Sequence, residues 1–234
     1  MLELNHPGKF PHPSECEDRG NGNLTPLVVD FSPPFGSNCM REKCMKVFGT
    51  SRMSFCLRTS PFGPVALLWS VFEGQPKIRR VLLSTPELSV KQLLKSSFSD
   101  SIPSACTGID EVADRIEALL QGEAVIFSLD VVRLDLCSEF QRKVLRAEHG
   151  IPRGSISTYQ RIARHLGRLS GGRAVGQALA NNPFPIIVPC HRAICSDRTL
   201  GGYQGGLAMK RALLEMEGIN FDGTGRITTE DFFY

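Results

Sequence analysis

Hydrophobic and polar positions follow regular patterns from about residue 51 to the end of the chain. Short apolar runs bounded by turn residues are typical of β-strands. Such runs predict strands over residues 53–59, 64–72, 78–83 and 124–129. Apolar residues that recur every three or four positions predict amphipathic helices. This spacing predicts helices over residues 86–97, 108–121 and 207–217.

Capping and stop signals predict three further helices in the second half of the chain. Residues 138–141 and 157–160 each begin with Ser and end with Gln, the capping-box spacing that opens a helix. The first of these helices ends at Gly150 and the second near residue 166. A third helix is predicted over residues 172–180. Two short helices joined by a glycine-containing turn predict a helix-turn-helix, although a helical hairpin within a core would show the same pattern.

These patterns divide the chain into three parts. Residues 1–50 are rich in Pro, Gly, Asn and Ser without periodicity, which predicts an irregular N-terminal extension. Residues 51–135 predict a small α/β domain, a small sheet with flanking helices. Residues 136–234 predict a mainly α-helical domain that contains the helix-turn-helix. Within that domain the apolar segment 183–189 is too short for a helix, and we expect it to be buried and extended.

Length and composition exclude several classes of protein. The chain has 234 residues, of which 41% are hydrophobic and 22% charged, so it is globular rather than disordered. Its longest uncharged apolar run, residues 64–72, is far shorter than the roughly 20 residues that a membrane span needs. The first 22 residues contain no apolar segment typical of a secretory signal. Without such a signal, the 8 cysteines indicate reduced thiols rather than a disulfide framework.

The net charge of +3 conceals an uneven distribution. Residues 138–217 contain twelve Lys and Arg against five Asp and Glu, whereas the rest of the chain contains fifteen against nineteen. A basic region within an otherwise slightly acidic chain favours contact with a polyanion such as nucleic acid. Solvated basic helices give the same asymmetry, so charge alone leaves both interpretations open.

A cysteine in an unusual setting carries the candidate chemistry. Cys190 comes directly after the apolar segment and is followed by His191 and Arg192. The thiolate form of cysteine is the nucleophile, and neighbouring cations lower the pKa of a thiol. Prolines at both ends of the apolar segment fix the backbone where the thiol emerges. This arrangement favours a positioned nucleophile over a buried structural cysteine.

The residues around Cys190 resemble the active-site signature of the O6-alkylguanine-DNA alkyltransferases, a family of single-use DNA-repair proteins. Near the cysteine the resemblance covers residues 182–192 (NPFPIIVPCHR) and 201–207 (GGYQGGL). It continues without gaps over about eighty residues, through the segments 140–144 (FQRKV), 151–154 (IPRG), 158–163 (TYQRIA), 172–176 (GRAVG) and 210–218 (KRALLEMEG). The turn at 60–63 (SPFG) more weakly resembles the first hairpin turn of the family's N-terminal domain.

The resemblance implies a role for each catalytic residue. Cys190 is the alkyl acceptor, His191 is the general base that acts through a water, and Glu217 orients the histidine. Taken alone, Glu217 has the pattern of a surface charge at a helix end. Glu215 is the nearby alternative, two residues away and therefore on a different face of the helix.

The resemblance also implies that the damaged base leaves the duplex, because chemistry on a base requires it to come out of the stack. Arg173 would fill the space of the displaced nucleotide, and Tyr159 would push the 3′ phosphate. Gly176, one helical turn after Arg173, would let that helix approach the minor groove closely. Without the resemblance, Arg173 could equally contact a phosphate and Tyr159 could equally pack at the start of a helix.

Further residues are implied to shape the active site. Asn182 braces the turn before the cysteine, with Asn181 as the neighbouring alternative. Four residues of a glycine-rich loop are implied to line the guanine pocket: Tyr203, Gln204, Gly205 and Gly206. Ala193 stands where a larger aliphatic residue is frequent in the family, so we expect it to widen this pocket.

The resemblance implies no cofactor and no methyl donor other than the lesion. A structural metal would need the weak candidate ligands His12, Cys16, Cys39 and Cys44, and free thiols in a loose segment are the favoured interpretation. The expected partner is double-stranded DNA containing O6-alkylguanine. We expect a monomer without membrane association, in the cytoplasm of a prokaryote or the nucleus of a eukaryote.

Three alternatives compete with an alkyltransferase. A lesion-binding sensor would share the fold but lack the acceptor cysteine. A transcription regulator would use the helix-turn-helix for sequence-specific binding in the major groove. A cysteine hydrolase would need an oxyanion hole and a substrate other than DNA. The presence of Cys190 within the matched residues favours irreversible transfer of the alkyl group from O6-alkylguanine to this cysteine, one base for each protein molecule.

Overall fold

The computed structural model describes residues 53–229 and 232–234, which belong to one compact unit, Cys39–Tyr234. The extension that we expect over residues 1–50 lies outside the described residues, and so do all four weak candidates for metal ligands. None of the helices in the described part of the chain is long and apolar enough to cross a membrane.

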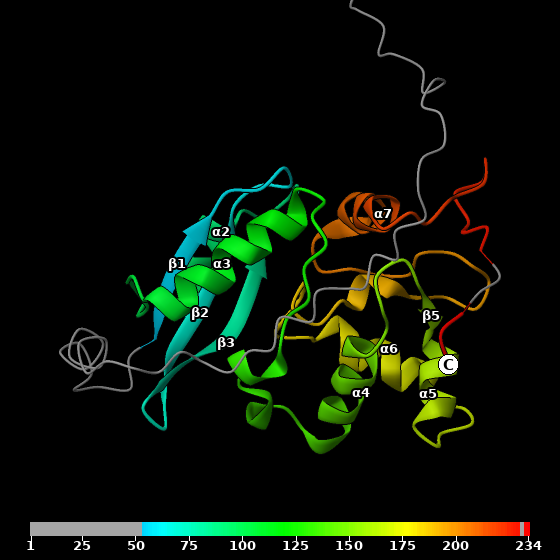
Figure 1. The fold of residues 1–234 in the computed structure, drawn as a ribbon, viewed down its shortest axis with the longest axis horizontal. Helices are drawn as coiled ribbons and strands as arrows, with labels where there is room; N and C mark the ends of the chain where they lie inside the picture. The colour runs from blue at the N-terminus through cyan, green and yellow to red at the C-terminus, as the bar shows by residue number, and fades with distance from the viewer. Residues whose placement is uncertain (1–52, 230–231) are drawn as a thin grey trace, which may run out of the picture. The chain divides into compact units, whose positions relative to one another are not determined.

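A four-stranded mixed sheet forms the first part of the described fold (Figure 1). Its strands are β1 (Ser54–Arg58), β2 (Val65–Phe72), β3 (Gln75–Leu83) and β4 (Ile102–Pro103). They lie in the order β3-β2-β1-β4, with β2 antiparallel to both β1 and β3, and β4 parallel to β1. A hydrogen bond of 3.1 Å from the Gly63 amide to the Ser60 carbonyl closes the turn from β1 to β2. The first three predicted strands are confirmed.

Helices cover both faces of this sheet, and the pattern of β2 shows why. Six successive residues of β2 are buried, because its side chains pack alternately on the two sides. Leu67 and Trp69 belong to the main hydrophobic core with the apolar face of α3 (Thr107–Leu120). Ala66 and Leu68 belong to a second core with α2 (Val90–Ser97). Figure 1 shows α3 lying across the sheet.

Two predictions in this part need correction. The segment 124–129 is not a strand, and side chains bind two of its carbonyls in place of a strand partner. Arg115 donates to the Ile126 carbonyl, and the His149 Nε2 atom lies 2.7 Å from the Phe127 oxygen. The helix predicted from residue 86 begins only at Val90, because Ser89 forms a complete capping box with Gln92.

The second part of the fold is mainly helical and contains the predicted helix-turn-helix. Its helices are α4 (Glu139–His149), α5 (Tyr159–His165), α6 (Gly172–Ala180) and α7 (Gly206–Met216). Gly167 ends α5 with φ +75 and leads through a short turn into α6. Two parallel two-residue strands, β5 (Ser157–Thr158) and β6 (Ala193–Ile194), join the start of α5 to the segment after Cys190, and the sequence did not predict them.

Both predicted capping boxes differ from the structure. Ser138 accepts a hydrogen bond from the Gln141 amide, but the Gln141 side chain donates to carbonyls of α6 and the residue after it, so the box is only half formed. The cap of α5 is Thr158 rather than Ser157. Ser157 is committed to β5, and its hydroxyl donates to the Phe233 carbonyl at 2.6 Å.

The segment 183–189 is buried as predicted, but it is not extended. Ile186 adopts φ +74, and the Val188 amide donates to the Phe184 carbonyl at 2.8 Å, so the chain folds back in a tight turn. Phe184, Ile186 and Val188 join the main hydrophobic core, which also takes side chains from α3 and α4. Apolarity predicted the burial, while the turn depends on hydrogen bonds that involve Asn182.

Candidate active site around Cys190

Asn182 holds the turn that presents Cys190. Its side-chain amide donates to the Val188 carbonyl at 3.2 Å, and its Oδ1 accepts from the Phe184 amide at 2.9 Å. Cys190 then begins a single 3₁₀ turn, with 5% of the residue exposed. The alternative Asn181 instead donates its side-chain amide to the Gln177 carbonyl at the end of α6. Asn182 therefore has the contacts that a brace requires.

Behind the cysteine, His191 and Arg192 share one carboxylate. The His191 Nε2 atom lies 3.0 Å from Oε1 of Glu217. Arg192 donates to both oxygens of Glu217, at 2.9 Å and 2.7 Å, and to the Ile151 carbonyl at 2.6 Å. The alternative Glu215 pairs with Arg211 on the surface, so Glu217 is the carboxylate that reaches the histidine.

Burial and hydrogen bonds set the protonation states of this group. Burial alone would raise the pKa of Glu217, but the hydrogen bonds from His191 and Arg192 outweigh burial and lower this pKa to about 2. Burial lowers the pKa of His191, and the hydrogen bond to Glu217 opposes that shift. The imidazole is thus neutral at pH 7 and donates through Nε2 to the carboxylate. Its buried Nδ1 has no hydrogen-bond partner among the described residues and can accept a proton.

Cys190 itself is a protonated thiol at neutral pH. Burial raises its pKa to about 11, and the charge of Glu148 adds to the rise, while the hydrogen bond from Asn182 and the charge of Lys210 oppose it. A thiol in this state is a poor nucleophile until a base removes its proton. The neutral imidazole of His191, next to it in the chain, is the base that the structure offers.

Cys190 forms part of a cavity of about 380 Å³. The cavity is lined by Tyr159, Gly176, Leu179, Ala180, Cys190, Cys195, Gly201, Gly202, Tyr203 and Gln204. Gly176 and Ala180 lie on one face of α6, and the exposed Arg173 continues that face by one turn towards the N-terminus. The hydroxyl of Tyr203 is buried without a hydrogen-bond partner among the described residues, so it is available to a ligand.

Not all the predicted loop residues line the cavity. The Gln204 side chain donates to the carbonyls of Ala180 and Asn182, which ties the loop to α6. Gly205 and Gly206 follow the lining residues but do not line the cavity themselves. A Cβ atom on Gly205 would lie 2.2 Å from the sulfur of Met209, so this glycine permits close packing under the loop.

The expectation for Ala193 is wrong. Ala193 is fully buried in β6 and is not among the residues that line the cavity. The lining residue from this segment is Cys195, two positions later. The β5–β6 pairing turns Ala193 into the core, and sequence similarity alone could not show that direction.

Sequence reasoning missed two buried charged residues beside the site. Lys210 is fully buried and donates to the carbonyls of Ala193 (2.6 Å), Leu200 (2.5 Å) and Gly202 (3.4 Å), which ties the cavity loop to α7. Burial lowers its pKa to about 8. Lys210 lies in a segment that matches the family, so the signal for it was present.

The second missed residue is Glu148, which is also fully buried. Burial raises its pKa to about 8, against the opposing charges of Lys210 and Arg192. Neither carboxyl oxygen has a hydrogen-bond partner of ordinary geometry among the described residues. Glu148 lies one turn after the buried Val144, on the apolar face of α4. The helical spacing of the sequence could therefore have indicated its burial.

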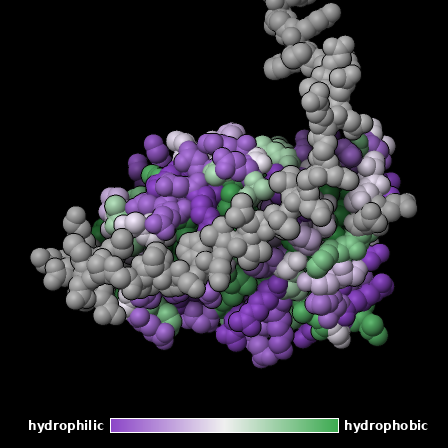
Figure 2. All heavy atoms as spheres, viewed as in Figure 1, coloured by the Kyte–Doolittle hydropathy of each residue, from purple (hydrophilic) through white to green (hydrophobic). Residues whose placement is uncertain are grey.

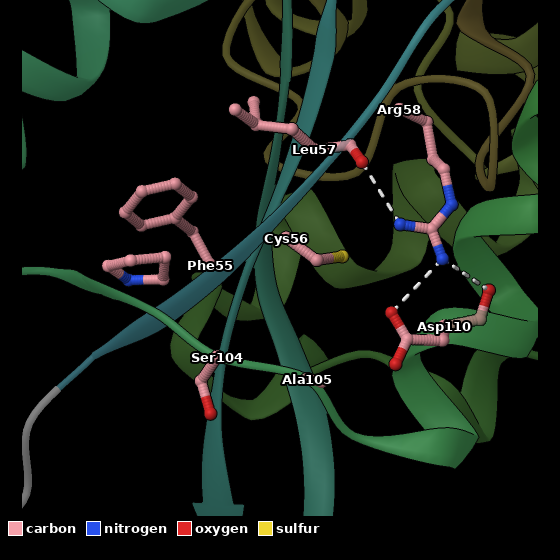
Figure 3. Close-up of a pocket in the computed structure, with 8 residues that line it drawn as sticks. Phe55, Cys56, Leu57, Arg58, Ser104, Ala105 and Asp110 are labelled. Atoms are coloured by element: carbon pink, nitrogen blue, oxygen red, sulfur yellow. Dashed lines mark hydrogen bonds and ion pairs between the residues drawn. The ribbon is translucent and has the colours of Figure 1, made fainter.

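A second cavity, of about 440 Å³, lies beside β1 and the segment before α3 (Figure 3). Figure 3 shows Phe55 and Leu57 on one side of the strand and Cys56 and Arg58 on the other. Arg58 is already paired with Asp110 at 3.0 Å, and burial raises the pKa of Cys56 to about 11. Both thiols are protonated, but no histidine lines this cavity, whereas Cys190 has His191 beside it. We therefore place the chemistry at Cys190, although its cavity is the smaller of the two.

A basic surface accompanies the helix-turn-helix. Four arginines of α5, the turn and the start of α6 are exposed: Arg161, Arg164, Arg168 and Arg173. On the face that Figure 2 shows, hydrophilic side chains also gather over α4. The uneven charge of the sequence thus corresponds to an exposed cationic surface next to the cavity helix.

The described fold and site define a class of protein that combines a helix-turn-helix with a buried cysteine and a histidine held by glutamate. The comparisons with known proteins agree with this class. Residues 139–219 match the family model described as 6-O-methylguanine DNA methyltransferase, DNA binding domain.

Named relatives and solved structures extend the match beyond this segment. A methylated-DNA–protein-cysteine methyltransferase of Methanothermobacter thermautotrophicus is 43% identical over 130 residues, which are 56% of this chain and 72% of the relative. One from Salmonella typhimurium is 35% identical over 162 residues, which are 68% of this chain and 92% of the relative. The crystal structure of Mycobacterium tuberculosis OGT in complex with DNA is 32% identical, with a TM-score of 0.56, and the match covers 70% of this chain and 93% of that chain. This chain belongs to the methylated-DNA–protein-cysteine methyltransferase family.

Proposed function

We propose that this protein repairs DNA by direct reversal, moving the alkyl group of O6-alkylguanine to Cys190. The observation that carries the proposal is the cavity with Cys190 in its wall, backed by a neutral histidine whose Nε2 is held by Glu217. That arrangement supplies a nucleophile, a base and a residue that orients the base. Family membership supplies the substrate class, since the relatives are named for methylated DNA.

The reaction follows from these protonation states. The Nδ1 atom of His191 takes the proton of the Cys190 thiol, through a bridging water. The thiolate attacks the alkyl carbon, a C–S bond forms, and the bond between that carbon and O6 breaks with its electron pair going to guanine. The guanine anion then takes up a proton from water, which leaves neutral guanine in the DNA. Glu217 and the imidazolium form an ion pair that stabilises the separated charge. The product is a thioether, so each protein molecule repairs one base and needs no cofactor.

The DNA contacts complete the proposal. Arg173 enters the space of the displaced nucleotide from the end of the α6 face that lines the cavity. Gly176 has no side chain, so this face of α6 can approach the DNA closely. Tyr159 lines the cavity and contacts the adjacent phosphate. The free hydroxyl of Tyr203 donates to the guanine as it leaves. Gly205 and Gly206 support the loop.

We propose further that the protein acts as a monomer on double-stranded DNA, in the cytoplasm of a prokaryote or the nucleus of a eukaryote. The proposed functional division places catalysis and DNA binding in residues 136–234, with residues 51–135 as a supporting α/β domain. The described residues of both parts contribute to one hydrophobic core, which favours a supporting role for the first part.

The test is mass spectrometry after incubation with a duplex that contains one O6-methylguanine. The expected result is one added methylene on the peptide that contains Cys190, together with restored guanine in the DNA. Cys190→Ser should abolish the transfer. Cys195→Ser is the matched control, because Cys195 lines the same cavity but has no histidine beside it. It should keep the transfer. Selective binding of the lesion without any transfer would replace this proposal with a lesion sensor.

A further inference from the structure

Leu169 is the most exposed of the large hydrophobic residues that the structure describes, with 85% of the residue accessible to solvent. It lies in the turn between α5 and α6, four residues before Arg173. Leaving a leucine side chain in water forgoes the free energy that its burial would provide. A single exposed leucine is ordinary on a protein surface, so the inference depends on how it is held and on what surrounds it.

The turn that carries Leu169 is held in place by hydrogen bonds. The Arg168 amide donates to the Ala163 carbonyl at 2.8 Å, and the Gln160 side chain donates to the Leu169 carbonyl at 2.5 Å. The two glycines that follow lie against α5: a Cβ atom on Gly171 would be 3.2 Å from that of Ala163, and one on Gly172 would be 2.9 Å from Gln160 Oε1. The exposure of Leu169 is therefore fixed by the fold of the turn.

The surroundings of Leu169 are cationic. Arg164, Arg168 and Arg173 are exposed on either side of it, and residues 161–173 contain no acidic residue. A protein partner that buried this leucine would also have to face these positive charges. Duplex DNA presents anionic phosphates on the outside, and apolar side chains can insert from the minor groove between base steps, where they partly unstack the bases. An apolar tip between arginines matches that combination of surfaces.

We propose that Leu169 is an apolar wedge that enters the DNA groove and packs against the bases beside the displaced nucleotide. This inference rests on the proposed function, since it assigns a second DNA contact to the same reaction. Arg173 and Leu169 then act from the two ends of one short segment, the first as a charged finger and the second as an apolar contact. Exposed arginines around them bind phosphates.

The test compares Leu169→Ser with Ile126→Ser. Ile126 is the matched control, because it is 75% exposed and lies in an irregular segment outside the helix-turn-helix. Each protein is assayed for affinity to a lesion-containing duplex over a range of salt concentrations. Each is also assayed for reaction with free O6-alkylguanine base, which needs no DNA contact. A duplex carrying 2-aminopurine next to the lesion reports unstacking by its fluorescence.

The wedge predicts that Leu169→Ser weakens duplex binding about tenfold, the factor that corresponds to about 1.4 kcal/mol. The fluorescence increase on binding should fall as well. The salt dependence of binding should stay unchanged, because leucine neutralises no phosphate, and the reaction with the free base should also stay unchanged. Ile126→Ser should match the wild-type protein in every assay.

Equal duplex affinities for Leu169→Ser and Ile126→Ser would overturn the wedge. A fall in the free-base reaction of Leu169→Ser would overturn it too, because the residue would then support the fold rather than contact DNA. Failure of the proposed function would be visible separately, since wild-type protein would transfer no alkyl group from either substrate.

Discussion

The sheet region, residues 54–120, and the region around the active site, residues 139–219, use burial in opposite ways. The buried polar residues of the sheet region are three serines: Ser54, Ser70 and Ser84. The active-site region buries five acidic or basic side chains: Glu148, His191, Arg192, Lys210 and Glu217. Both regions contribute to the main hydrophobic core, so the contrast lies in the polar groups and not in the apolar packing.

This contrast separates what stabilises the protein from what gives it chemistry. Burying apolar side chains provides free energy in proportion to the area removed from water. Burying a charge costs free energy unless a partner and hydrogen bonds offset it. In the active-site region this cost is present, and the same burial shifts the pKa values of its groups away from those in water. The sheet region buries no acidic or basic side chain and serves as support.

The largest effect is expected when one partner of the buried charge group is removed. Glu217→Gln leaves Arg192 buried without a carboxylate, which should lower the free energy of unfolding by about 3–5 kcal/mol. Alkyl transfer to Cys190 should also slow, because His191 loses the charge that stabilises its protonated form. Urea unfolding and a single-turnover transfer assay measure the two effects.

The surface pair Arg211–Glu215 is the control for that change. Glu215 is one helical turn along α7 from Arg211, and both side chains are about half exposed. Glu215→Gln should therefore change the free energy of unfolding by no more than about 0.5 kcal/mol. Equal effects of the two substitutions would mean that burial does not distinguish the two carboxylates, and the comparison between the regions would lose its basis.

A substitution that creates a cavity in the core of the sheet region should lower the free energy of unfolding without changing the rate of alkyl transfer. Ile116 of α3 is fully buried in the main core, and Ile116→Ala should cost about 2–4 kcal/mol in the free energy of unfolding. Where the variant is folded, the reaction of Cys190 with free O6-alkylguanine should proceed at the wild-type rate. A slower reaction in fully folded protein would show that the sheet region takes part in the chemistry.

The buried carboxyl group of Glu148 should make the stability of the protein depend on pH, whereas the sheet region buries no carboxyl group. Burial raises the pKa of Glu148 to about 8 in the folded protein, whereas in the unfolded chain the group ionises near pH 4. Its stabilising contribution is therefore complete below about pH 4 and is lost as the pH rises towards 8, with a slope of up to about 1.4 kcal/mol per pH unit. Lys210 and Arg192, the cations that face it, oppose the rise in the pKa and so limit the pH range over which this stability is lost.

Glu148→Gln removes this titration while keeping the shape of the side chain. The variant should gain stability relative to the wild-type protein as the pH rises from 5 to 8, measured by urea unfolding at each pH. Parallel stability curves for the two proteins would contradict the shifted pKa. An exposed carboxyl such as Glu111 of α3 is the control, and Glu111→Gln should show no such divergence.

The smallest effect is expected at a glycine of the cavity wall. Gly201 has φ +66, and a Cβ atom there would lie 2.8 Å from the Tyr159 hydroxyl oxygen and 3.1 Å from the Cys195 sulfur. Gly201→Ala should cost about 1–2 kcal/mol from the backbone and should slow transfer of large alkyl groups more than transfer of methyl. Gly74→Ala, at φ +75 with nothing near its Cβ position, should show the backbone cost without a change in selectivity.

The helices were largely predictable because their signals are local. The apolar face of α3 and the bounds of α6 follow from spacing within a few residues, and Gly167 ends α5 where the sequence indicated. The strands β4, β5 and β6 were not predictable, because each has two residues and exists only through its partner. The cap of α5 moved from Ser157 to Thr158 for the same reason, since β5 fixes the register.

The candidate site likewise contains residues that the sequence indicated and contacts that it could not show. The sequence indicated Cys190, His191 and Glu217 through the family resemblance, and the structure brings the histidine and the glutamate within hydrogen-bond distance. Arg192 was visible beside the cysteine, but its pairing with Glu217 spans 25 residues and could not be read from the pattern. The buried Glu148 and the carbonyl contacts of Lys210 likewise join segments that are far apart in the chain.

The sequence by itself determined which residue types carry the chemistry, where the helices lie and that the second half of the chain is basic, because these properties reside in short segments. Only the tertiary structure decided that His191 bonds to Glu217 through Nε2 and keeps Nδ1 free, that the pKa of Cys190 rises to about 11, and that Ala193 faces the core. Protonation state and side-chain direction depend on burial and on hydrogen-bond partners. Those come from parts of the chain that meet only when the protein is folded.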